Sequence, residues 1–374
     1  MDIKNIYLHN YRNYQELNLN LSPNINIFTG FNAQGKTNII EAIHFASIGI
    51  SHRTRTENDL IYWNSNQANI QIKFSKMDII STLKFNLNKQ RTKEINLNGE
   101  TIKQRELPGL LTMVLFSPED LMLIKGSPLL RRRFLDIELS QVGSIYYNEL
   151  VKYNKLLFQR NTLLKKIREN NSDRELLDIW DNQFAKCAGF ITEKRLKGIY
   201  DLNNLIKDIH KWITQGTEDL NIKYIIHKQN NNLSTDSVQN YDGKYLEKWY
   251  LDNLKKYQNS DIFRGTTSIG PHRDDISFFI NDIDLKSFGS QGQQRSCVLS
   301  LKLAEMEFLK QETGEYPVLL LDDVMSELDT KRRQNLLALL QEKNIQTLIT
   351  ATDRELFNDN IKNKFFTVNH GNVI

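Results

Sequence analysis

The chain is poor in cysteine, has no long apolar run and carries almost no net charge. Its two cysteines, Cys187 and Cys297, lie in helix-like patterns without a CxxC or metal-ligand spacing, which argues against a disulfide scaffold. No stretch approaches the roughly 18 consecutive apolar residues of a membrane span, and the first residues lack the apolar core of a signal peptide. With 49 Lys and Arg residues against 45 Asp and Glu residues, charge alone is a weak argument for nucleic acid. We therefore expect a cytoplasmic protein with no membrane partner.

The hydrophobic pattern in the first part of the chain predicts strands interrupted by one helix. Residues 25–28 form an apolar strand that runs into a glycine turn, and helical spacing begins at Thr37. Residues 68–98 alternate between apolar and polar side chains, as strands with one buried face do. Asn98 and Gly99 then form a hairpin signal, because both residues adopt positive φ readily. The pattern predicts a mixed β region around a strand, loop and helix.

A helical section follows and is itself followed by a second α/β pattern. Residues 129–264 read as long helices with too few heptads for a long coiled coil. Beyond them, apolar strands such as residues 276–280 alternate with helices, which predicts a parallel sheet. We therefore predict an α/β fold in which residues 1–128 and 265–374 form one domain with a mixed β lobe. Residues 129–264 are expected to form an inserted all-helical lobe.

The residues from 30 to 37 match the complete P-loop pattern, GxxxxGK[ST]. They are Gly30, Phe31, Asn32, Ala33, Gln34, Gly35, Lys36 and Thr37. A strand enters the loop and a helix leaves it, so backbone N–H groups and the helix N-terminus can bind phosphate. Lys36 would neutralise the β- and γ-phosphate oxygens, and the Thr37 hydroxyl would ligate Mg²⁺. The alternative is a glycine turn that precedes a helix by chance. The complete pattern in this context predicts a site for ATP and Mg²⁺.

A second part of the same site is expected at the end of the apolar strand 318–321. Asp322 follows this strand directly, where a carboxylate would help to hold Mg²⁺. Asp323 comes next and could polarise the attacking water as a general base. A pair of Asp residues can also simply cap a following helix. We therefore take Lys36 and Asp323 as candidate catalytic residues, and Thr37 and Asp322 as candidate metal ligands.

The separation of these two parts indicates the class of ATPase. Asp322 lies 286 residues after Lys36, with the helical section between them. Small kinases and GTPases place the two elements within one compact domain, whereas ABC-type heads split them with a helical lobe. ABC-type heads also carry a signature of the form [SL]-S-G-G-Q before a helix that lies upstream of the acidic strand. The spacing therefore favours an ABC-type head over a small kinase.

The candidate signature is Ser290-Gln291-Gly292-Gln293-Gln294. Ser290 and Gln293 have the spacing of a capping box, which satisfies the first N–H groups of a helix. The same helix start could also bind an anion, because its N–H groups point outwards and carry partial positive charge. We therefore expect Ser290, Gly292 and Gln293 to contact the phosphate of an ATP that a second copy of the chain holds. The two interpretations are compatible.

Several separate strings resemble the RecF family of recombination mediator ATPases, whose heads are of the SMC type. They are LHNYRNY, FTGFNAQGKTNIIEAI, SHRTRTENDLI, VLFSPEDLMLIKGSPLLRRRFLD, GPHRDDI, GSQGQQR and PVLLLDDVMSELD. The resemblance runs nearly end to end. It implies an ATP-dependent homodimer on duplex DNA near single-strand junctions, action with RecR and RecO, and slow DNA-stimulated hydrolysis that releases the clamp. The expected roles are recombinational repair, replication restart and the SOS response to DNA damage.

Three departures from the wider ABC pattern leave the catalytic assignments open. Asp323 stands where most ABC heads have Glu, and residues 350–352 stand where transporters have a switch His. Residues 117–120 occupy the region in which a Q-loop Gln would be expected. These features favour an ATPase that uses ATP as a conformational switch over one that uses hydrolysis to drive a power stroke. A transporter ATPase and a scaffold that binds ATP without hydrolysing it are the alternatives.

Basic residues give the weakest evidence about DNA. Three clusters occur, at residues 131–133, 165–168 and 331–333. Such clusters are usually solvated helix faces, although two of them could form a groove that follows the phosphates of DNA. Three further arginines lie in the family strings and could reach nucleotide or remain at the surface: Arg12, Arg53 and Arg55. His272 is expected to be a turn residue.

Overall fold

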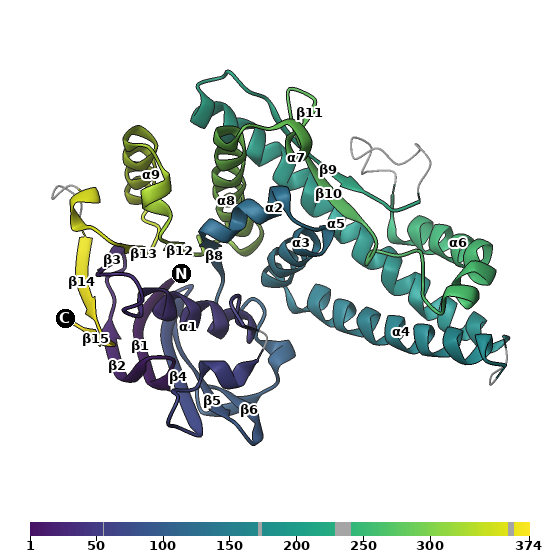
Figure 1. Ribbon diagram of the computed structural model, residues 1–374, viewed down its shortest axis with the longest axis horizontal. Helices are drawn as coiled ribbons and strands as arrows, with labels where there is room; N and C mark the ends of the chain where they lie inside the picture. Colours follow the sequence, from purple (N-terminus) through teal and green to yellow (C-terminus); the bar gives the residue numbers. More distant parts are fainter. Residues whose placement is uncertain (55, 171–173, 229–240, 358–362) are drawn as a thin grey trace. The chain divides into compact units, whose positions relative to one another are not determined.

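The computed structural model describes residues 1–54, 56–170, 174–228, 241–357 and 363–374. These residues form two compact units (Figure 1). The first unit combines residues 1–120 with residues 305–374, and the second contains residues 121–304.

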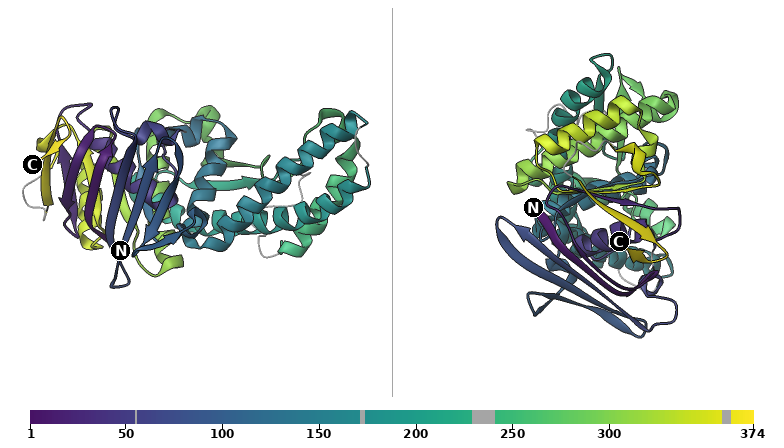
Figure 2. Two further views of the ribbon diagram at one scale, coloured as in Figure 1. Left: turned by 90° about the horizontal axis from the view of Figure 1, so that it is seen from below. Right: turned by 90° about the vertical axis from the view of Figure 1, so that its left-hand side faces the viewer.

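The first unit contains an antiparallel sheet built from the N-terminal part of the chain. Its strands, in order across the sheet, are β2 (Tyr14–Asn20), β1 (Asp2–Tyr11), β4 (Gln67–Lys76), β5 (Ile79–Asn88), β6 (Arg91–Leu97) and β7 (Glu100–Ile102). The purple and blue strands lie side by side in one layer (Figure 2). The predicted hairpin is confirmed, because Asn98 and Gly99 both have positive φ and join the paired strands β6 and β7.

The second sheet of this unit is mainly parallel. Its order is β15 (Asn372–Val373), β14 (Asn363–Asn369), β3 (Ile25–Thr29), β13 (Thr347–Ala351), β12 (Val318–Asp322) and β8 (Met113–Phe116). From β14 to β8 all neighbours run parallel, and β12 and β13 are buried along their whole length. Burial on both faces explains their continuous apolar sequences. The predicted parallel sheet is confirmed for β3, β12 and β13.

One buried helix contributes to the hydrophobic core that the two sheets share. Helix α1 (Lys36–Ile48) has side chains in the same hydrophobic cluster as β1, β4 and β5 on one side and β3, β12 and β13 on the other. A helix that is buried nearly all round needs apolar residues on every face, and its sequence KTNIIEAIHFASI supplies them. The unit also contains α9 (Thr330–Glu342). The start of α1 is thereby fixed beside the ends of the parallel strands.

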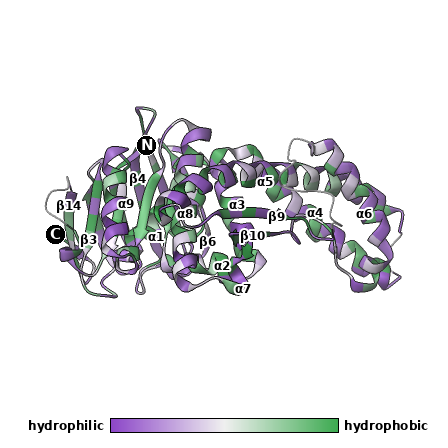
Figure 3. Ribbon diagram, turned by 90° about the horizontal axis from the view of Figure 1, so that it is seen from above, coloured by the Kyte–Doolittle hydropathy of each residue, from purple (hydrophilic) through white to green (hydrophobic). Residues whose placement is uncertain are grey.

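Helices make up most of the second unit. They are α2 (Met122–Lys125), α3 (Pro128–Val142), α4 (Ser144–Arg168), α5 (Leu176–Thr214), α6 (Gly243–Arg264), α7 (Leu285–Phe288) and the first part of α8 (Gln291–Thr313). Both hydrophobic and hydrophilic residues line α4, α5 and α6, as expected for helices with one buried face (Figure 3). The predicted long helices are therefore confirmed. Within the described ranges no helix has both the length and the apolar character of a membrane span.

A small antiparallel sheet corrects the predicted boundaries. β10 (Asp275–Ile280) lies between β9 (Leu220–Ile225) and β11 (Ile283–Asp284), and it does not join the parallel sheet. Its alternating burial is that of a strand with one covered face. Because β9 belongs to the predicted insertion, the expectation that residues 129–264 are all-helical is wrong for that strand. Pairing with β9 also explains why β10, which lies beyond the predicted insertion, belongs to the second compact unit.

Three helices of the second unit meet at a buried ion cluster. Arg160 of α4 is fully buried. Its Nε donates to Asp181 Oδ1 of α5 at 2.6 Å, and its Nη1 donates to Asp261 Oδ2 of α6 at 2.9 Å. The same Nη1 also donates to the Thr267 hydroxyl at 2.9 Å. The cluster therefore ties α4, α5 and α6 together at one point in the interior.

Candidate nucleotide site

The loop between β3 and α1 has the backbone of a phosphate-binding loop. Gly30 has a φ of 151° and Gly35 a φ of 118°, which L side chains rarely adopt. A Cβ at Gly30 would lie 2.3 Å from the Val368 carbonyl oxygen, and one at Gly35 would lie 2.8 Å from the Tyr14 hydroxyl. Both positions therefore require glycine. The three residues at the tip of the loop are exposed: Phe31, Asn32 and Ala33.

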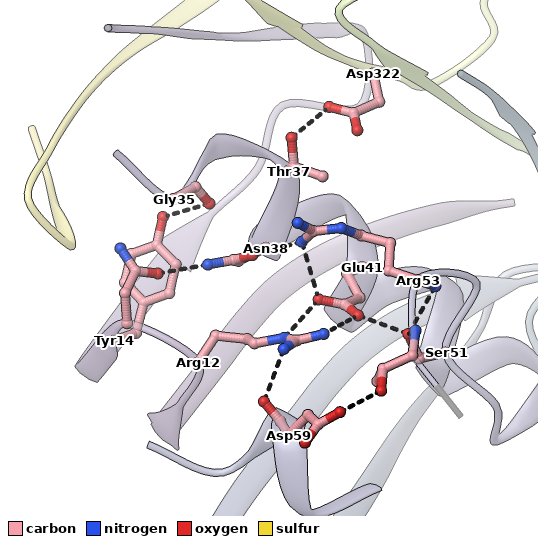
Figure 4. A network of polar contacts seen from close by, with 12 residues as sticks. Arg12, Tyr14, Gly35, Thr37, Asn38, Glu41, Ser51, Arg53, Asp59 and Asp322 are labelled. Carbon is pink, nitrogen blue, oxygen red and sulfur yellow. Dashed lines mark hydrogen bonds and ion pairs between the residues drawn. The ribbon is translucent and has the colours of Figure 1, made fainter. Parts of the chain in front are cut away.

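Neighbouring turns hold this loop from outside. The Tyr14 hydroxyl donates to the Gly35 carbonyl at 3.0 Å (Figure 4). Asn13 Nδ2 donates to the Gln34 carbonyl at 2.9 Å. From the other side, the His370 N–H donates to Gln34 Oε1 at 2.6 Å. The β1–β2 turn therefore holds the loop backbone, and the β14–β15 turn holds the Gln34 side chain, before any ligand arrives. A preorganised loop loses less conformational entropy when it binds.

Lys36 directs its ammonium group into the loop. Its Nζ donates to the carbonyl of Gly30 at 2.6 Å and to that of Phe31 at 2.9 Å. Burial lowers the pKa of Lys36, and the negative charges of Asp323 and Asp322 oppose that effect. The ammonium therefore lies where phosphate oxygens would enter, close to two carboxylates.

The structure brings Thr37 and Asp322 together, although they lie 285 positions apart. The Thr37 hydroxyl donates to Asp322 Oδ1 at 3.0 Å, and the Thr350 hydroxyl donates to the same oxygen at 2.6 Å. Asp322 ends β12, while Thr37 follows the loop that leaves β3, two strands away in the same sheet. Hydroxyl and carboxylate oxygens are ligands that Mg²⁺ accepts. The pair therefore fits a magnesium ion.

Thr350 is a positioning residue that the sequence analysis did not assign. Thr350 pairs with Asp322 across the β12–β13 ladder, and its hydroxyl accepts the N–H of Asp323 at 2.9 Å. Asp323 has a φ of 54°, in the left-handed region, and is half-buried where the chain leaves the strand. Thr350 thus holds both neighbouring aspartates. Its buried hydroxyl orients the acidic pair.

Glu41, on helix α1, is a second residue of this region that the sequence analysis did not identify. Glu41 is fully buried, and Arg12 binds it with two hydrogen bonds of 2.8 and 2.6 Å. The Ser51 hydroxyl donates to it at 2.6 Å, and Arg53 Nη1 donates at 3.3 Å (Figure 4). Burial raises the pKa of Glu41, but these hydrogen bonds and the two positive charges outweigh it, so the pKa is lowered. Arg12 and Arg53 therefore support α1; Arg55 lies outside the described residues.

The candidate signature forms the capping box that its sequence predicts. The Gln293 N–H donates to the Ser290 hydroxyl at 3.2 Å, and the Ser290 N–H donates to Gln293 Oε1 at 3.0 Å. Ser290 and Gly292 are exposed, and Gln293 Nε2 also donates to Glu218 Oε1 at 3.0 Å. The bond to Glu218 fixes the direction of the Gln293 side chain. Contact with a second copy's ATP stays a prediction.

The first basic cluster is not a uniformly solvated face, because Arg131 is buried, Arg132 is half-buried and Arg133 is exposed. Arg131 is buried, and its Nε donates to Asp275 Oδ1 at 2.7 Å. Arg132 Nη1 donates to the Asp274 carbonyl at 2.6 Å. In the third cluster, Arg333 binds two backbone carbonyls, at Met325 and Leu328. Lys165, Lys166 and Arg168 in the second cluster are exposed.

The fold and the site together define the class of the protein. A P-loop between β3 and α1, an acidic strand end beside it and a second unit inserted between them are the features of an SMC-like ABC-type ATPase head. The family model described as "RecF/RecN/SMC N terminal domain" matches residues 2–373. The chain is 46% identical over 377 residues to "DNA replication and repair protein RecF" of Clostridium botulinum (strain ATCC 19397 / Type A), with 100% of this chain and 99% of that relative covered. The chain belongs to the RecF family.

Further relatives and solved structures agree. The RecF of Clostridium perfringens (strain SM101 / Type A) is 47% identical over 356 residues, which cover 95% of this chain and 94% of that protein. The "Structure of the recombination mediator protein RecF-ATP in RecFOR pathway" matches with a TM-score of 0.91 at 33% identity, over 100% of this chain and 96% of that one. An Smc head bound to the C-winged helix domain of ScpA matches with a TM-score of 0.57 at 17% identity, which supports the fold alone.

Proposed function

We propose that this chain is an ATP-dependent DNA-binding clamp of the RecF type. ATP joins two copies head to head on duplex DNA near junctions with single-stranded DNA, and slow hydrolysis releases them. The clamp acts in the cytoplasm with RecR and RecO, in recombinational repair and replication restart. The observation that carries the proposal is the 3.0 Å contact between Thr37 and Asp322 beside a complete phosphate loop. The RecF structure with ATP and the repair proteins among the relatives support it.

The residues present suit ATP with Mg²⁺. Backbone N–H groups of residues 30–37 would hold the phosphates, and Lys36 would contact the β- and γ-oxygens. Thr37 and Asp322 would hold Mg²⁺, which supplies neutralisation of phosphate charge. Thr350 keeps Asp322 in place through its 2.6 Å hydrogen bond. Asp323, held by the same threonine, is the proposed general base.

Dimerisation is proposed because the candidate signature presents an exposed helix start with open space beside it. The N–H groups of residues 291 and 292 open α8 and have no intrahelical partner by geometry. Space is open around Gly292, since a Cβ there would meet only the Ser290 hydroxyl, at 3.9 Å. A phosphate group from a second copy would find exposed donors and the positive end of a helix of 23 residues.

The variant Ser290→Arg is expected to bind ATP but to remain a monomer, because a long side chain would fill the space beside Gly292. Light scattering with and without ATP measures the dimer, and a labelled ATP analogue measures binding. Ser287→Arg, an exposed position on the neighbouring α7, is the matched control. A normal ATP-dependent dimer of Ser290→Arg would remove Ser290 from the proposed interface.

The variant Asp323→Asn is expected to lower the rate of ATP hydrolysis by about 10²-fold or more, because general-base catalysis typically contributes that factor. The ATP-bound dimer should then persist on a gapped DNA duplex. Phosphate release measures turnover, and light scattering on the duplex measures persistence. Asp282→Asn, in the exposed β10–β11 turn, is the control. Full turnover of Asp323→Asn would exclude it as the base, and a wild-type chain without turnover would favour a scaffold that does not hydrolyse ATP.

A further inference from the structure

A cationic cavity lies in the second unit. Its volume is about 420 Å³, and its lining comes from the start of α3, the end of α6, the segment after α6 and the residues that follow β9. Four of the lining residues are Lys or Arg, and two are His: Arg132, Lys228, Arg264, Arg273, His227 and His272. The lining contains no Asp or Glu among the described residues. The cavity therefore concentrates positive charge.

Two arginines of the cavity, Arg132 and Arg273, are bound to backbone carbonyls. Arg132 Nη1 donates to the Asp274 carbonyl at 2.6 Å. Arg273 Nη2 donates to the Thr267 carbonyl at 3.1 Å. Among the described residues, neither of them, nor Arg264, forms an ion pair with a carboxylate. Their charge is therefore left for a ligand.

The nearby carboxylates are already occupied. Asp275 is paired with Arg131 at 2.7 Å, and Asp261 with Arg160 at 2.9 Å. Asp274 is buried and accepts hydrogen bonds from the Tyr224 hydroxyl at 2.8 Å and from the His227 N–H at 2.9 Å. Burial raises the pKa of Asp274 to about 6. These acids therefore cannot turn to neutralise the cavity without leaving their present partners.

Burial, with a further contribution from neighbouring positive charge, lowers the pKa values of Lys228 and His227. Burial lowers the pKa of Lys228; Asp261 opposes that shift, and the charges of Arg264 and Arg273 add to it. Burial also lowers the pKa of His227, together with the charges of Lys228 and Arg273. An anion in the cavity would relieve this repulsion.

Two uncharged features also belong to the lining of the cavity, Ser268 and the start of α3. Ser268 is 7% exposed and lines it, and the Ser268 Oγ has no hydrogen-bond partner among the described residues. A buried hydroxyl without a partner is costly, so such groups are usually satisfied by a ligand or water. The start of α3, at Ser127 and Pro128, also lines the cavity, and a helix N-terminus favours negative charge. Arginines, a free hydroxyl and a helix start are the elements of a phosphate site.

We propose that this cavity binds a phosphate group, supplied either by a free nucleotide or by the backbone of a nucleic acid. Planar guanidinium groups match the oxygens of phosphate and bind them with charge-assisted hydrogen bonds. The volume falls in the range of small-ligand sites, so the group that carries the phosphate can enter as well. The site uses only residues of the second unit, and it is separate from the P-loop, which belongs to the first.

The experiment first removes phosphate binding at the P-loop, so that binding at the cavity is measured alone. In a full-length Lys36→Met chain, inorganic pyrophosphate, AMP and a short DNA duplex are titrated separately by calorimetry. The pair Arg264→Gln and Arg273→Gln, both at exposed positions, should weaken binding by at least about tenfold, because it removes charge-assisted hydrogen bonds. The pair Lys223→Gln and Lys248→Gln makes the same change of charge at exposed positions outside the cavity lining and should not. Binding of AMP indicates a free nucleotide, and binding of the duplex indicates backbone phosphate.

A single substitution, Ser268→Ala, tests the cavity in a variant that is expected to remain folded. Ser268→Ala removes a buried hydroxyl without a partner, so the free chain should melt at the same or a higher temperature. Pyrophosphate binding should nevertheless weaken by about fivefold, the typical value of one neutral hydrogen bond. The proposal is overturned if the Lys36→Met chain binds none of the three probes. It is also overturned if the arginine pair and Ser268→Ala bind them as tightly as their parent.

Discussion

Replacement of Lys36 by methionine is expected to abolish ATP binding at the P-loop. The Lys36 ammonium lies within hydrogen-bonding distance of two loop carbonyls, where phosphate oxygens would enter, and no other lysine or arginine belongs to the loop. Each charge-assisted hydrogen bond contributes about 1.5–3 kcal/mol, so the loss of contacts to two phosphates should weaken affinity by roughly 10²-fold or more. Methionine has a similar length and is tolerated in buried positions. Fluorescence polarisation of a labelled ATP analogue measures the loss.

The matched control is Lys89→Met, in the exposed turn between β5 and β6. It removes the same charge from the same unit without touching the loop, so its affinity should equal that of the wild type. The melting temperature of Lys36→Met, measured without nucleotide, tests whether the fold survives. If the folded variant bound the analogue as tightly as the control, the phosphate role of Lys36 would be untenable.

The parts of the site that are local in sequence could be predicted from it. The glycines of the P-loop, the strand before it and the helix after it occupy one continuous stretch, so backbone geometry follows from residue type. Asp322 could also be placed, because an apolar strand buried on both faces must belong to the central sheet and its end must lie with the other strand ends. The capping box at Ser290 lies within four consecutive residues, 290–293.

Most other contacts between distant segments could not be predicted from the sequence. The strand 276–280 has the same apolar character whether it joins a parallel sheet or pairs with β9, and the actual partner depends on how the second unit folds. Arg131 belongs to a run of three arginines, which is typical of a surface. Its burial depends on Asp275, more than a hundred positions away, which supplies the counter-charge. Charge patterns in a sequence do not reveal such partners.

The same limit applies to Glu41 and to the cationic cavity. Glu41 looks like an ordinary helix residue until Arg12 and Arg53 are seen to bind it from two other segments. Arg132 and Arg273 lie in two separate family strings, RRRFLD and GPHRDDI, and the sequence analysis expected only a turn at the second. The fold brings both strings to one cavity. A chemical role for Arg132 and Arg273 therefore became visible only once the fold showed that the two strings lie together.

Replacement of Arg160 by methionine is expected to destabilise the second unit by about 3–5 kcal/mol, the usual effect of leaving buried charges without their partner. Asp181 and Asp261 would then both lie in the interior without a cation. Urea unfolding followed by tryptophan fluorescence measures the loss, since Trp180, Trp212 and Trp249 all belong to this unit. Arg168→Met on the same helix is the control. Its exposed ion pair with Glu169, at 3.7 Å, should contribute no more than about 1 kcal/mol.

The pH dependence of this loss distinguishes unpaired charge from lost packing. In the wild type, burial already raises the pKa of Asp181, although Arg160 opposes the shift. Without Arg160 the opposing effect is gone, so the folded variant binds protons more tightly than its unfolded state. Its free energy of unfolding should therefore rise, relative to the wild type, as the pH falls from 7 through the raised pKa. A loss that stays constant between pH 7 and about 5 would show that packing, and not unpaired carboxylates, accounts for the role of Arg160.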